Sequence, residues 1–421
     1  MPRTTIKNAS TEPSRSVIGS KQHNNILFFI IFCCFVVFFN FTMINMITSK
    51  CNRGDFQEDD DSYIEPNEPK VLHWNSTERL NRPTAYTCHP NDRNGMKEIK
   101  NLMRSVLPEY EWKDLNIKFQ RGMRRMPDEY LQENYTNEYD VFLGIFWGNC
   151  HSIVERWLRT HFNGRSVYFS GETEDLHPIM GKDTWRIHSF GPTTLVHERD
   201  LPLTYLQMTW WQYFQEVLSP SKMITIEERP RSNMTHYMIY ANSNCVKYRE
   251  EAIGLLSQFG IVHCDGKCQG TTPPSGNRTN LVRTKSGVNV ENWWYNVQKY
   301  SNYRFCFVME HTGNHPMYMT EKILMAFAAG CIPVYYGHQN IFHIFNKDSF
   351  VFYNISNPQP ALDLVQNLET QKELYDEMMR QPILSNGENT ISEYFSFSDE
   401  VGNGYLKQLM RKKLNLANLV P

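Results

Sequence analysis

The pattern of apolar and polar positions predicts two successive groups of alternating strands and helices. In the first group, apolar runs at 140–147 and 166–169 enclose segment 151–162, whose apolar residues recur at helical spacing. In the second group, strands at 237–241 and 261–264 enclose a helical pattern at 246–259. A strand–helix–strand rhythm favours parallel sheets covered by helices. The expected fold class is therefore α/β.

The segment 303–337 continues the second group and carries the clearest pattern. Strand, loop, helix and strand are expected in turn over 303–309, 310–319, 321–329 and 332–336. Thr320 is expected to cap the helix at its N-terminus, and Gly330 to end it. Further helices are expected at 97–106, 292–300 and 360–380, and an interdomain linker at 219–233.

Two cations stand in the first turns of helices that follow strands. Lys322 opens the helix after 303–309, and Arg249 opens the helix after 237–241. The helix dipole disfavours a cation there by a few tenths of a kcal/mol unless an anion lies in front of it. Open α/β sheets bind ligands beyond the carboxyl ends of their strands, so the two cations can converge on one diphosphate. The alternative for Arg249 is an ion pair with Glu250 or an exposed neighbour.

The N-terminal region predicts a membrane anchor. Segment 26–47 contains no charged residue and spans roughly 33 Å as a helix, enough to cross a bilayer. Basic residues precede it, and the acidic segment 55–68 follows it. The positive-inside rule then predicts a cytosolic tail at 1–25 and a lumenal main part. A cleaved signal peptide is the alternative, but its apolar core is usually shorter.

Sequons and cysteines agree with a lumenal placement. Five sequons follow the apolar segment, at Asn75, Asn134, Asn233, Asn277 and Asn354. Eight cysteines also follow it, which permits disulfides of a connectivity that the sequence leaves open. Cys264 and Cys268 have the spacing of a metal half-site, but no partner pair follows at zinc spacing, so no zinc site is expected.

The net charge and the acidic segment argue against two kinds of function, nucleic-acid binding and the use of a metal-held nucleotide. A net charge of −2 argues against a nucleic-acid-binding protein. The acidic segment 55–70 is typical of a solvated stem. It contains Asp59–Asp61, which matches the D-x-D motif of metal-using glycosyltransferases, but a solvated stem is the favoured interpretation. A metal-held nucleotide is therefore not expected.

The second group of elements resembles the α1,3/4-fucosyltransferases of glycosyltransferase family 10. The motifs that carry the resemblance are Met309-Glu310-His311, Tyr318-Met319-Thr320-Glu321-Lys322, Ile332-Pro333-Val334, Asn242 to Cys245 with Arg249, Gly266-Lys267-Cys268 and Phe169-Ser170-Gly171-Glu172. The resemblance covers most of 140–353 and is most specific over 302–337. His311 stands where the family usually has Asn, so the contact that this side chain makes is left open.

The resemblance implies a GT-B fold, with two Rossmann-like domains and a cleft between them, preceded by a transmembrane signal anchor and stem. The corresponding division is a cytosolic tail at 1–25, the anchor at 26–47, a stem and lead-in at 48–135, an acceptor-side domain at 136–225, a GDP-fucose-binding domain at 226–365 and a helical tail at 366–421. It also implies a single-pass type II enzyme of the Golgi membrane.

The resemblance implies an inverting transfer of L-fucose from GDP-fucose, usually to O3 of an N-acetylglucosamine in a glycoprotein glycan. Such a transfer needs a base for the acceptor proton and cations for the departing diphosphate. The roles that it implies are catalytic base for Glu172, with Glu174 as the fallback; phosphate contacts for Arg249 and Lys322; nucleoside and fucose contacts for Tyr318 and Glu321; and a place near the sugar for Glu310. No obligatory metal is expected, although divalent ions could assist.

Two other functions remain open at this stage. A Golgi glycosyltransferase that uses another nucleotide sugar would share the sheet and the phosphate cations. A catalytically inactive type II membrane lectin would keep the fold without the chemistry. The presence of Glu172, Arg249 and Lys322 favours an active enzyme.

Overall fold

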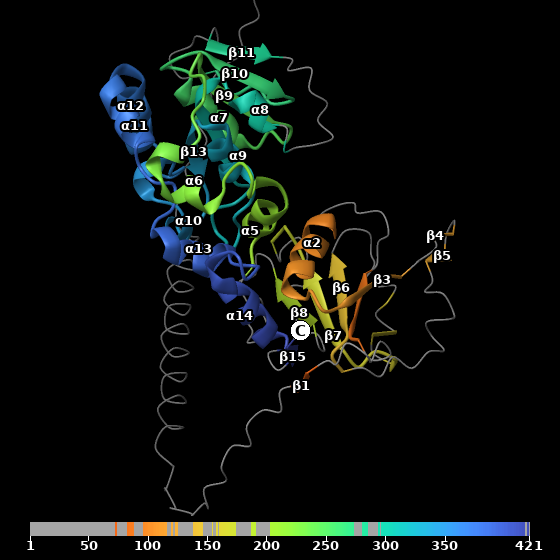
Figure 1. Cartoon of the computed structure of the whole chain (residues 1–421). Helices are drawn as coiled ribbons and strands as arrows, with labels where there is room; N and C mark the ends of the chain where they lie inside the picture. The colour runs from red at the N-terminus through yellow and green to blue at the C-terminus, as the bar shows by residue number, and fades with distance from the viewer. Residues whose placement is uncertain are drawn as a thin grey trace, which may run out of the picture. The chain divides into compact units, whose positions relative to one another are not determined.

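The computed structural model of the chain describes residues 72–73, 82–87, 96–115, 119–120, 123–124, 138–145, 154, 157–158, 160–173, 187–190, 203–272, 280–284, 294, 296–416 and 419–420 (Figure 1). The chain divides into two compact units, 1–68 and 69–421, and every described residue belongs to the second. The expected anchor at 26–47, the acidic segment 55–70 and Glu174 lie outside the described residues. Within the described part, no helix has both the length and the apolar character to cross a bilayer.

The first sheet has five parallel strands in the order β3-β2-β6-β7-β8. Its strands are β2 (Thr84–Thr87), β3 (Glu111–Asp114), β6 (Val141–Ile145), β7 (Arg165–Phe169) and β8 (Ile187–Phe190). The predicted strands at 140–147 and 166–169 are confirmed. The sheet also takes β2 and β3 from the region that the sequence analysis assigned to the stem and lead-in.

Helices from both ends of the described chain cover this first sheet. One apolar cluster contains buried side chains of α2 (Met96–Val106), of α14 (Tyr405–Lys413) and of strands β6 and β7. Leu102 of α2 and Met410 of α14 are both fully buried there. The region 366–421 was predicted as a helical tail. Its last helix, α14, packs against the first sheet.

The second sheet has six parallel strands in the order β11-β10-β9-β12-β13-β14. Its strands are β9 (His236–Asn242), β10 (Val262–Gly266), β11 (Leu281–Thr284), β12 (Tyr303–Met309), β13 (Ile332–Tyr336) and β14 (Val351–Phe352). The predicted strands over 237–241, 261–264, 303–309 and 332–336 are all confirmed. Together, the two sheets confirm the α/β fold class.

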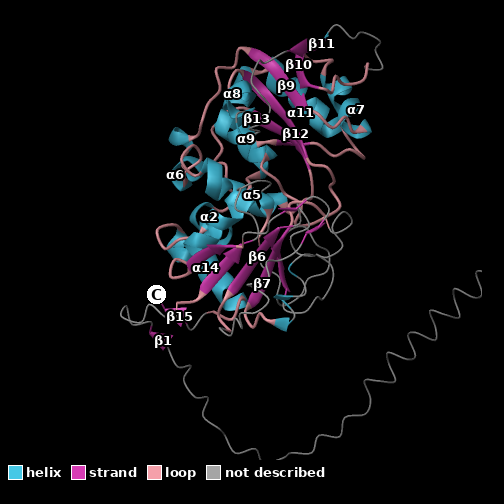
Figure 2. Ribbon diagram, turned by 90° about the vertical axis from the view of Figure 1, so that its right-hand side faces the viewer, coloured by secondary structure: helices cyan, strands magenta, loops and turns pink. Residues whose placement is uncertain are grey.

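Helices lie on both faces of the second sheet (Figure 2). On one face, α9 (Lys322–Ala329) and Tyr300 of α8 (Asn296–Tyr300) pack with Cys306 and Val308 of β12. On the other, α7 (Lys247–Leu256) packs with Phe305 and Phe307 of the same strand. Successive side chains of a strand point to opposite faces, so a strand covered on both sides is apolar throughout. This explains the apolar run that predicted β12, in which Arg304 is the one charged residue.

The remaining elements connect these layers. They are β1 (Leu72–His73) paired with β15 (Leu419–Val420), β4 (Phe119–Gln120) paired with β5 (Met123–Arg124), α5 (Tyr205–Thr209), the π-helix η3 (Trp210–Phe214), α6 (Pro220–Ile224), η4 (Ile226–Glu228), α10 (Ile341–Ile344), η7 (Lys347–Ser349), α11 (Gln359–Thr370), α12 (Lys372–Met379), α13 (Gly387–Phe395) and η8 (Gly402–Gly404). The predicted helical region at 360–380 is confirmed as two helices, α11 and α12.

Two disulfides hold the second sheet near the motifs of the sequence analysis. Cys245 pairs with Cys268, which joins the segments that follow β9 and β10. Cys306 in β12 pairs with Cys331, which precedes β13. Because Cys268 is bonded to Cys245, the spacing between Cys264 and Cys268 does not mark a metal half-site.

Segment 219–233, which was predicted as an interdomain linker, lies between the strands of the first sheet and β9, and it is folded. It forms α6 and η4, and Arg229 at its end is only 4% exposed. The guanidinium of Arg229 donates hydrogen bonds to the carbonyls of Met378, Gln381 and Ser349 at 2.9, 2.8 and 3.1 Å. Because these carbonyls belong to η7, α12 and the residues after α12, Arg229 joins segments that are far apart in sequence.

Replacing Arg229 by Leu should destabilise the protein by about 3–5 kcal/mol, because three buried carbonyls lose their donor. The matched control is Arg231→Leu. Arg231 is exposed and reaches one carbonyl, that of Met379, at 3.5 Å, so its loss should cost about 0.5 kcal/mol or less. Denaturant unfolding of both variants measures the difference. Equal losses would contradict the structural role of Arg229.

Candidate donor site

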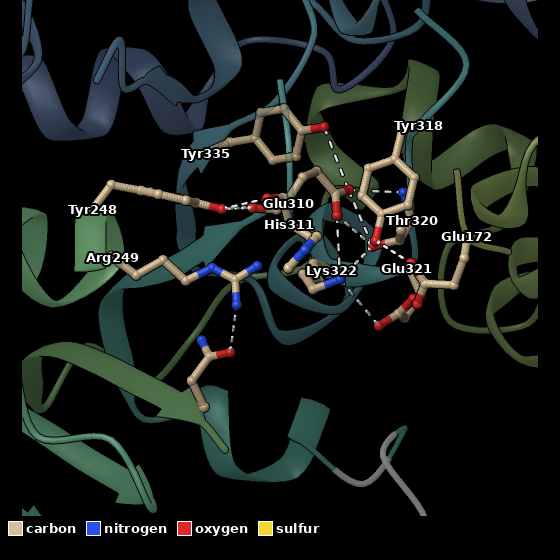
Figure 3. Close-up of polar contacts among 11 residues, drawn as sticks. Glu172, Tyr248, Arg249, Glu310, His311, Tyr318, Thr320, Glu321, Lys322 and Tyr335 are labelled. Carbon is tan, nitrogen blue, oxygen red and sulfur yellow. Dashed lines mark hydrogen bonds and ion pairs between the residues drawn. The ribbon is translucent and has the colours of Figure 1, made fainter. Parts of the chain in front are cut away.

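The candidate site lies at the carboxyl ends of β9 and β12, where α7 and α9 begin (Figure 3). Arg249 is in the first turn of α7, and Lys322 is the first residue of α9. The structure thus brings to one edge of the sheet the two cations that the sequence placed at separate strand-to-helix junctions.

Glu310, directly after β12, forms the buried centre of the site. Its side chain is fully buried. Its carboxylate accepts hydrogen bonds from the Thr320 backbone N–H at 2.7 Å, the Thr320 hydroxyl at 2.8 Å and the Lys322 ammonium at 3.2 Å. The Tyr335 hydroxyl donates a longer bond of 3.4 Å. The resemblance placed Glu310 near the sugar, whereas the structure surrounds its carboxylate with donors of the protein itself.

Thr320 does not cap α9, so that prediction was wrong. The N-cap position belongs to Glu321, and no side chain caps the helix there. The Thr320 hydroxyl donates to Glu310 instead, because a buried carboxylate needs donors more than the helix end needs an acceptor. Gly330 ends the helix as predicted, with a left-handed φ of 76° that favours glycine.

Lys322 is held as a cation by its neighbours. Its ammonium contacts Glu310 at 3.2 Å, the Thr320 hydroxyl at 2.8 Å and Glu321 at 3.9 Å. Burial acts to lower the pKa of Lys322, but the two carboxylates outweigh burial, and the net pKa is raised. A cation in the first turn of a helix is unfavourable without an anion nearby. Glu310 supplies part of that negative charge.

Arg249 is buried without a carboxylate partner among the described residues. The residue is 3% exposed, and its guanidinium donates a long bond to the Asn242 side chain at 3.4 Å. Its Nε atom is buried and has no hydrogen-bond partner. The alternative of pairing with Glu250 is not observed, because that carboxylate accepts from the Tyr240 hydroxyl and the Gly270 backbone N–H. A buried guanidinium with an unused donor is suited to binding an anion.

Tyr248 is a residue of this site that the sequence analysis missed. Its hydroxyl lies 2.8 and 2.7 Å from the backbone carbonyls of Glu310 and His311, which share its single proton. It thereby fastens the start of α7 to the loop after β12. A tyrosine next to Arg249 carries no distinctive sequence signal, because the contact depends on a loop 62 residues away.

Glu172 comes from the first sheet and meets the second at Tyr318. It follows β7 in a turn that Ser170 closes, with the Ser170 hydroxyl accepting from the Glu172 backbone N–H at 3.0 Å. The Tyr318 hydroxyl donates to Oε2 of Glu172 at 3.2 Å. The structure thus brings Glu172 to the same segment that carries Glu321 and Lys322 (Figure 3).

Glu321 lies between these groups, and its side chain is 14% exposed. Its pKa is raised, first by burial and further by Glu310, while Lys322 acts in the opposite direction. A carboxyl at the edge of the site can accept hydrogen bonds from hydroxyl groups of a bound ligand.

A metal is not favoured by the clusters that the described residues form. The one group of three possible ligands among them comprises Cys245, Glu250 and Cys268. The two cysteines share a disulfide, and the Glu250 carboxylate already accepts from Tyr240 and Gly270. This donor set does not fit a metal ion.

Replacing Glu310 by Gln should lower the free energy of unfolding by about 2–4 kcal/mol. The amide keeps the size of the side chain but removes the charge that the half-buried ammonium of Lys322 pairs with. The matched control is Glu251→Gln, whose exposed ion pair with Lys247 should contribute less than about 0.5 kcal/mol. Denaturant unfolding measures both losses, and a negligible loss for Glu310→Gln would refute its central place.

Comparison with known proteins finds similarity over the second group of elements. Residues 230–380 match the family model described as glycosyltransferase family 10 (fucosyltransferase) C-term. The chain is 26% identical over 153 residues to the putative fucosyltransferase R654 of Acanthamoeba polyphaga mimivirus, a match covering 36% of this chain and 24% of that protein. It is 34% identical over 99 residues to the alpha-(1,3)-fucosyltransferase FucT of Helicobacter pylori, covering 23% of this chain and 20% of that protein.

The matched region therefore spans about a quarter or less of the length of these relatives. A solved structure of an alpha1,3-fucosyltransferase with GDP-fucose is similar with a TM-score of 0.47 and 17% identity, over 82% of this chain and 94% of that chain. The matched residues contain β9, α7, β12 and α9, and hence Arg249, Glu310 and Lys322. Over residues 230–380, the chain is therefore similar to the C-terminal domain of the fucosyltransferases of glycosyltransferase family 10.

Proposed function

We propose that the protein transfers L-fucose from GDP-fucose to O3 of an N-acetylglucosamine in glycoprotein glycans. The observation that carries the proposal is the buried guanidinium of Arg249, with an unpartnered Nε, on the edge of the sheet that also holds Lys322. This pair lies in the region that matches the family 10 model, and a diphosphate is the ligand that matches its charge and donors. The expected GT-B arrangement would place this donor between the two sheets.

The proposed reaction is a single displacement with inversion. The acceptor O3 attacks C1 of fucose while the bond from C1 to the diphosphate oxygen breaks, and the bonding electrons leave with GDP. Glu172 takes the proton of the acceptor hydroxyl, since a carboxylate can accept a proton and the two cations cannot. Arg249 and Lys322 stabilise the negative charge that develops on the departing diphosphate.

Glu321 suits a contact with the hydroxyl groups of the donor. It is a mostly buried carboxyl at the start of α9, next to the proposed phosphate contact. We propose no obligatory metal, because the two cations already supply the charge that a divalent ion supplies in metal-using transferases.

A direct assay separates this function from its two alternatives. The purified protein is incubated with GDP-fucose, or with other nucleotide sugars, and a panel of defined glycans that end in core chitobiose, N-acetyllactosamine or LacdiNAc, with EDTA present. Transfer from GDP-fucose alone supports the proposal. Transfer from another donor would identify a different glycosyltransferase, and glycan binding without transfer would identify a lectin.

Arg249→Ala and Glu172→Gln should have opposite signatures. Losing the guanidinium removes a charge-assisted phosphate contact, so affinity for GDP should fall roughly ten- to a hundredfold. Losing the base should cut turnover by roughly a hundredfold or more and leave GDP affinity unchanged. Calorimetric GDP titration and initial rates measure both. Near-normal turnover of a folded Glu172→Gln enzyme would exclude this residue and direct attention to Glu174.

We also propose a type II placement in the Golgi membrane, with 26–47 as the anchor and the catalytic part lumenal. Among the sequons expected to be lumenal, those at Asn233 and Asn354 lie at exposed asparagines. Peptide mapping after glycosidase treatment of the full chain from a eukaryotic host should find glycans on Asn354, whereas the sequon at Asn8 in the cytosolic tail should stay unmodified. Modification of Asn8 instead would reverse the topology.

A further inference from the structure

We propose that Tyr318 is a positioning residue for the base, and that its hydroxyl fixes the Glu172 carboxylate relative to the donor site. The inference rests on the proposed function, in which Glu172 accepts the proton. It differs from the donor contact that the family resemblance implies for Tyr318. The contact that carries it is the hydrogen bond of 3.2 Å from the Tyr318 hydroxyl to Oε2 of Glu172.

Tyr318 is itself held rigidly. Its side chain is 3% exposed, and its backbone N–H donates to the His315 carbonyl at 3.0 Å. On its C-terminal side, the Met319 carbonyl accepts from the Leu206 backbone N–H at 3.0 Å, and Thr320 is bonded to Glu310. The phenol therefore offers a fixed donor rather than a mobile one.

The direction of the hydrogen bond follows from the charges around the phenol. Burial, and then the carboxylates of Glu310, Glu172 and Glu321, raise the pKa of Tyr318 well above its usual value. Its hydroxyl therefore keeps its proton at every working pH and acts as the donor. Glu172 accepts at Oε2, and among the described residues no donor bonds to Oε1. The second oxygen remains for the acceptor hydroxyl.

The backbone of Glu172 is fixed from its own side as well. The Ser170 hydroxyl accepts from the Glu172 N–H at 3.0 Å and donates to the Glu172 carbonyl at 2.9 Å. With the backbone tied to Ser170 and Oε2 tied to Tyr318, the carboxylate has little remaining freedom. A base held in this way loses less entropy when the transition state forms.

One short segment then sets the geometry of both halves of the reaction. Tyr318 contacts the base, and Lys322, four residues later, contacts the leaving group. Between them, Thr320 is anchored to Glu310, which also holds Lys322. The base and the cation that contacts the leaving group are thus both positioned through the buried carboxylate of Glu310.

The test is Tyr318→Phe, which removes the hydroxyl and keeps the ring. Turnover should fall about tenfold or more, while the GDP dissociation constant and the donor KM stay within about twofold. The acidic limb of the pH profile of kcat/KM should move to higher pH, because the ionised base loses a hydrogen bond that favours it. In a Glu172→Gln background, the same substitution should cause no further loss of turnover.

The matched control is Tyr237→Phe, another buried tyrosine that loses a hydrogen bond, here to the Leu256 carbonyl at 3.0 Å. It should lower the melting temperature without moving the pH profile. A rise in donor KM or GDP dissociation constant with unchanged turnover in Tyr318→Phe would make Tyr318 a donor ligand and overturn the inference. An unmoved acidic limb would overturn it too. Failure of the proposed function would show already in the wild-type enzyme, as an absence of transfer from GDP-fucose.

Discussion

The candidate site depends on one buried charge, the carboxylate of Glu310. A carboxylate without contact to water is tolerated only if protein donors replace its hydration, and this one has the Thr320 N–H and hydroxyl, the Lys322 ammonium and the Tyr335 hydroxyl. These donors come from the loop after β12, the start of α9 and strand β13. Satisfying the carboxylate therefore orders the whole turn from Glu310 to Lys322, including Tyr318 and Glu321.

This constraint explains which local rules the sequence breaks. A cation in the first turn of α9 is unfavourable in isolation, and a threonine before that helix would ordinarily serve as its cap. Both residues are recruited by Glu310 instead. The helix N-terminus loses a little stability, and the carboxylate gains the donors that its burial requires.

Patterns within a few residues of one another were sufficient to predict much of the fold. Strands β12 and β13 were predicted from their apolar residues, which cover both faces of each strand; Arg304 of β12 is the one charged residue in the two strands. The short β2 and β3 were missed, since TAYT and EWKD mix polar and apolar residues as exposed segments also do. Contacts between segments far apart in the sequence could not be predicted from such patterns. Neither the packing of α14 against α2 nor the role of Arg229 leaves a local trace.

The structure brings the predicted site residues together, but the two cations differ in how many of their hydrogen-bond donors are still unused. Two of the three donors of the Lys322 ammonium are taken by Glu310 and Thr320, so an incoming phosphate can gain little more than one hydrogen bond there. Arg249 has a long bond to Asn242 and an unpartnered Nε. A buried guanidinium in that state gains more from an anion than an ammonium already neutralised by its neighbours. In the proposed reaction, the two cations that looked equivalent in the sequence would therefore have different roles. Arg249 would supply most of the new contact to the diphosphate, and Lys322 a positive charge that is in place before the ligand binds.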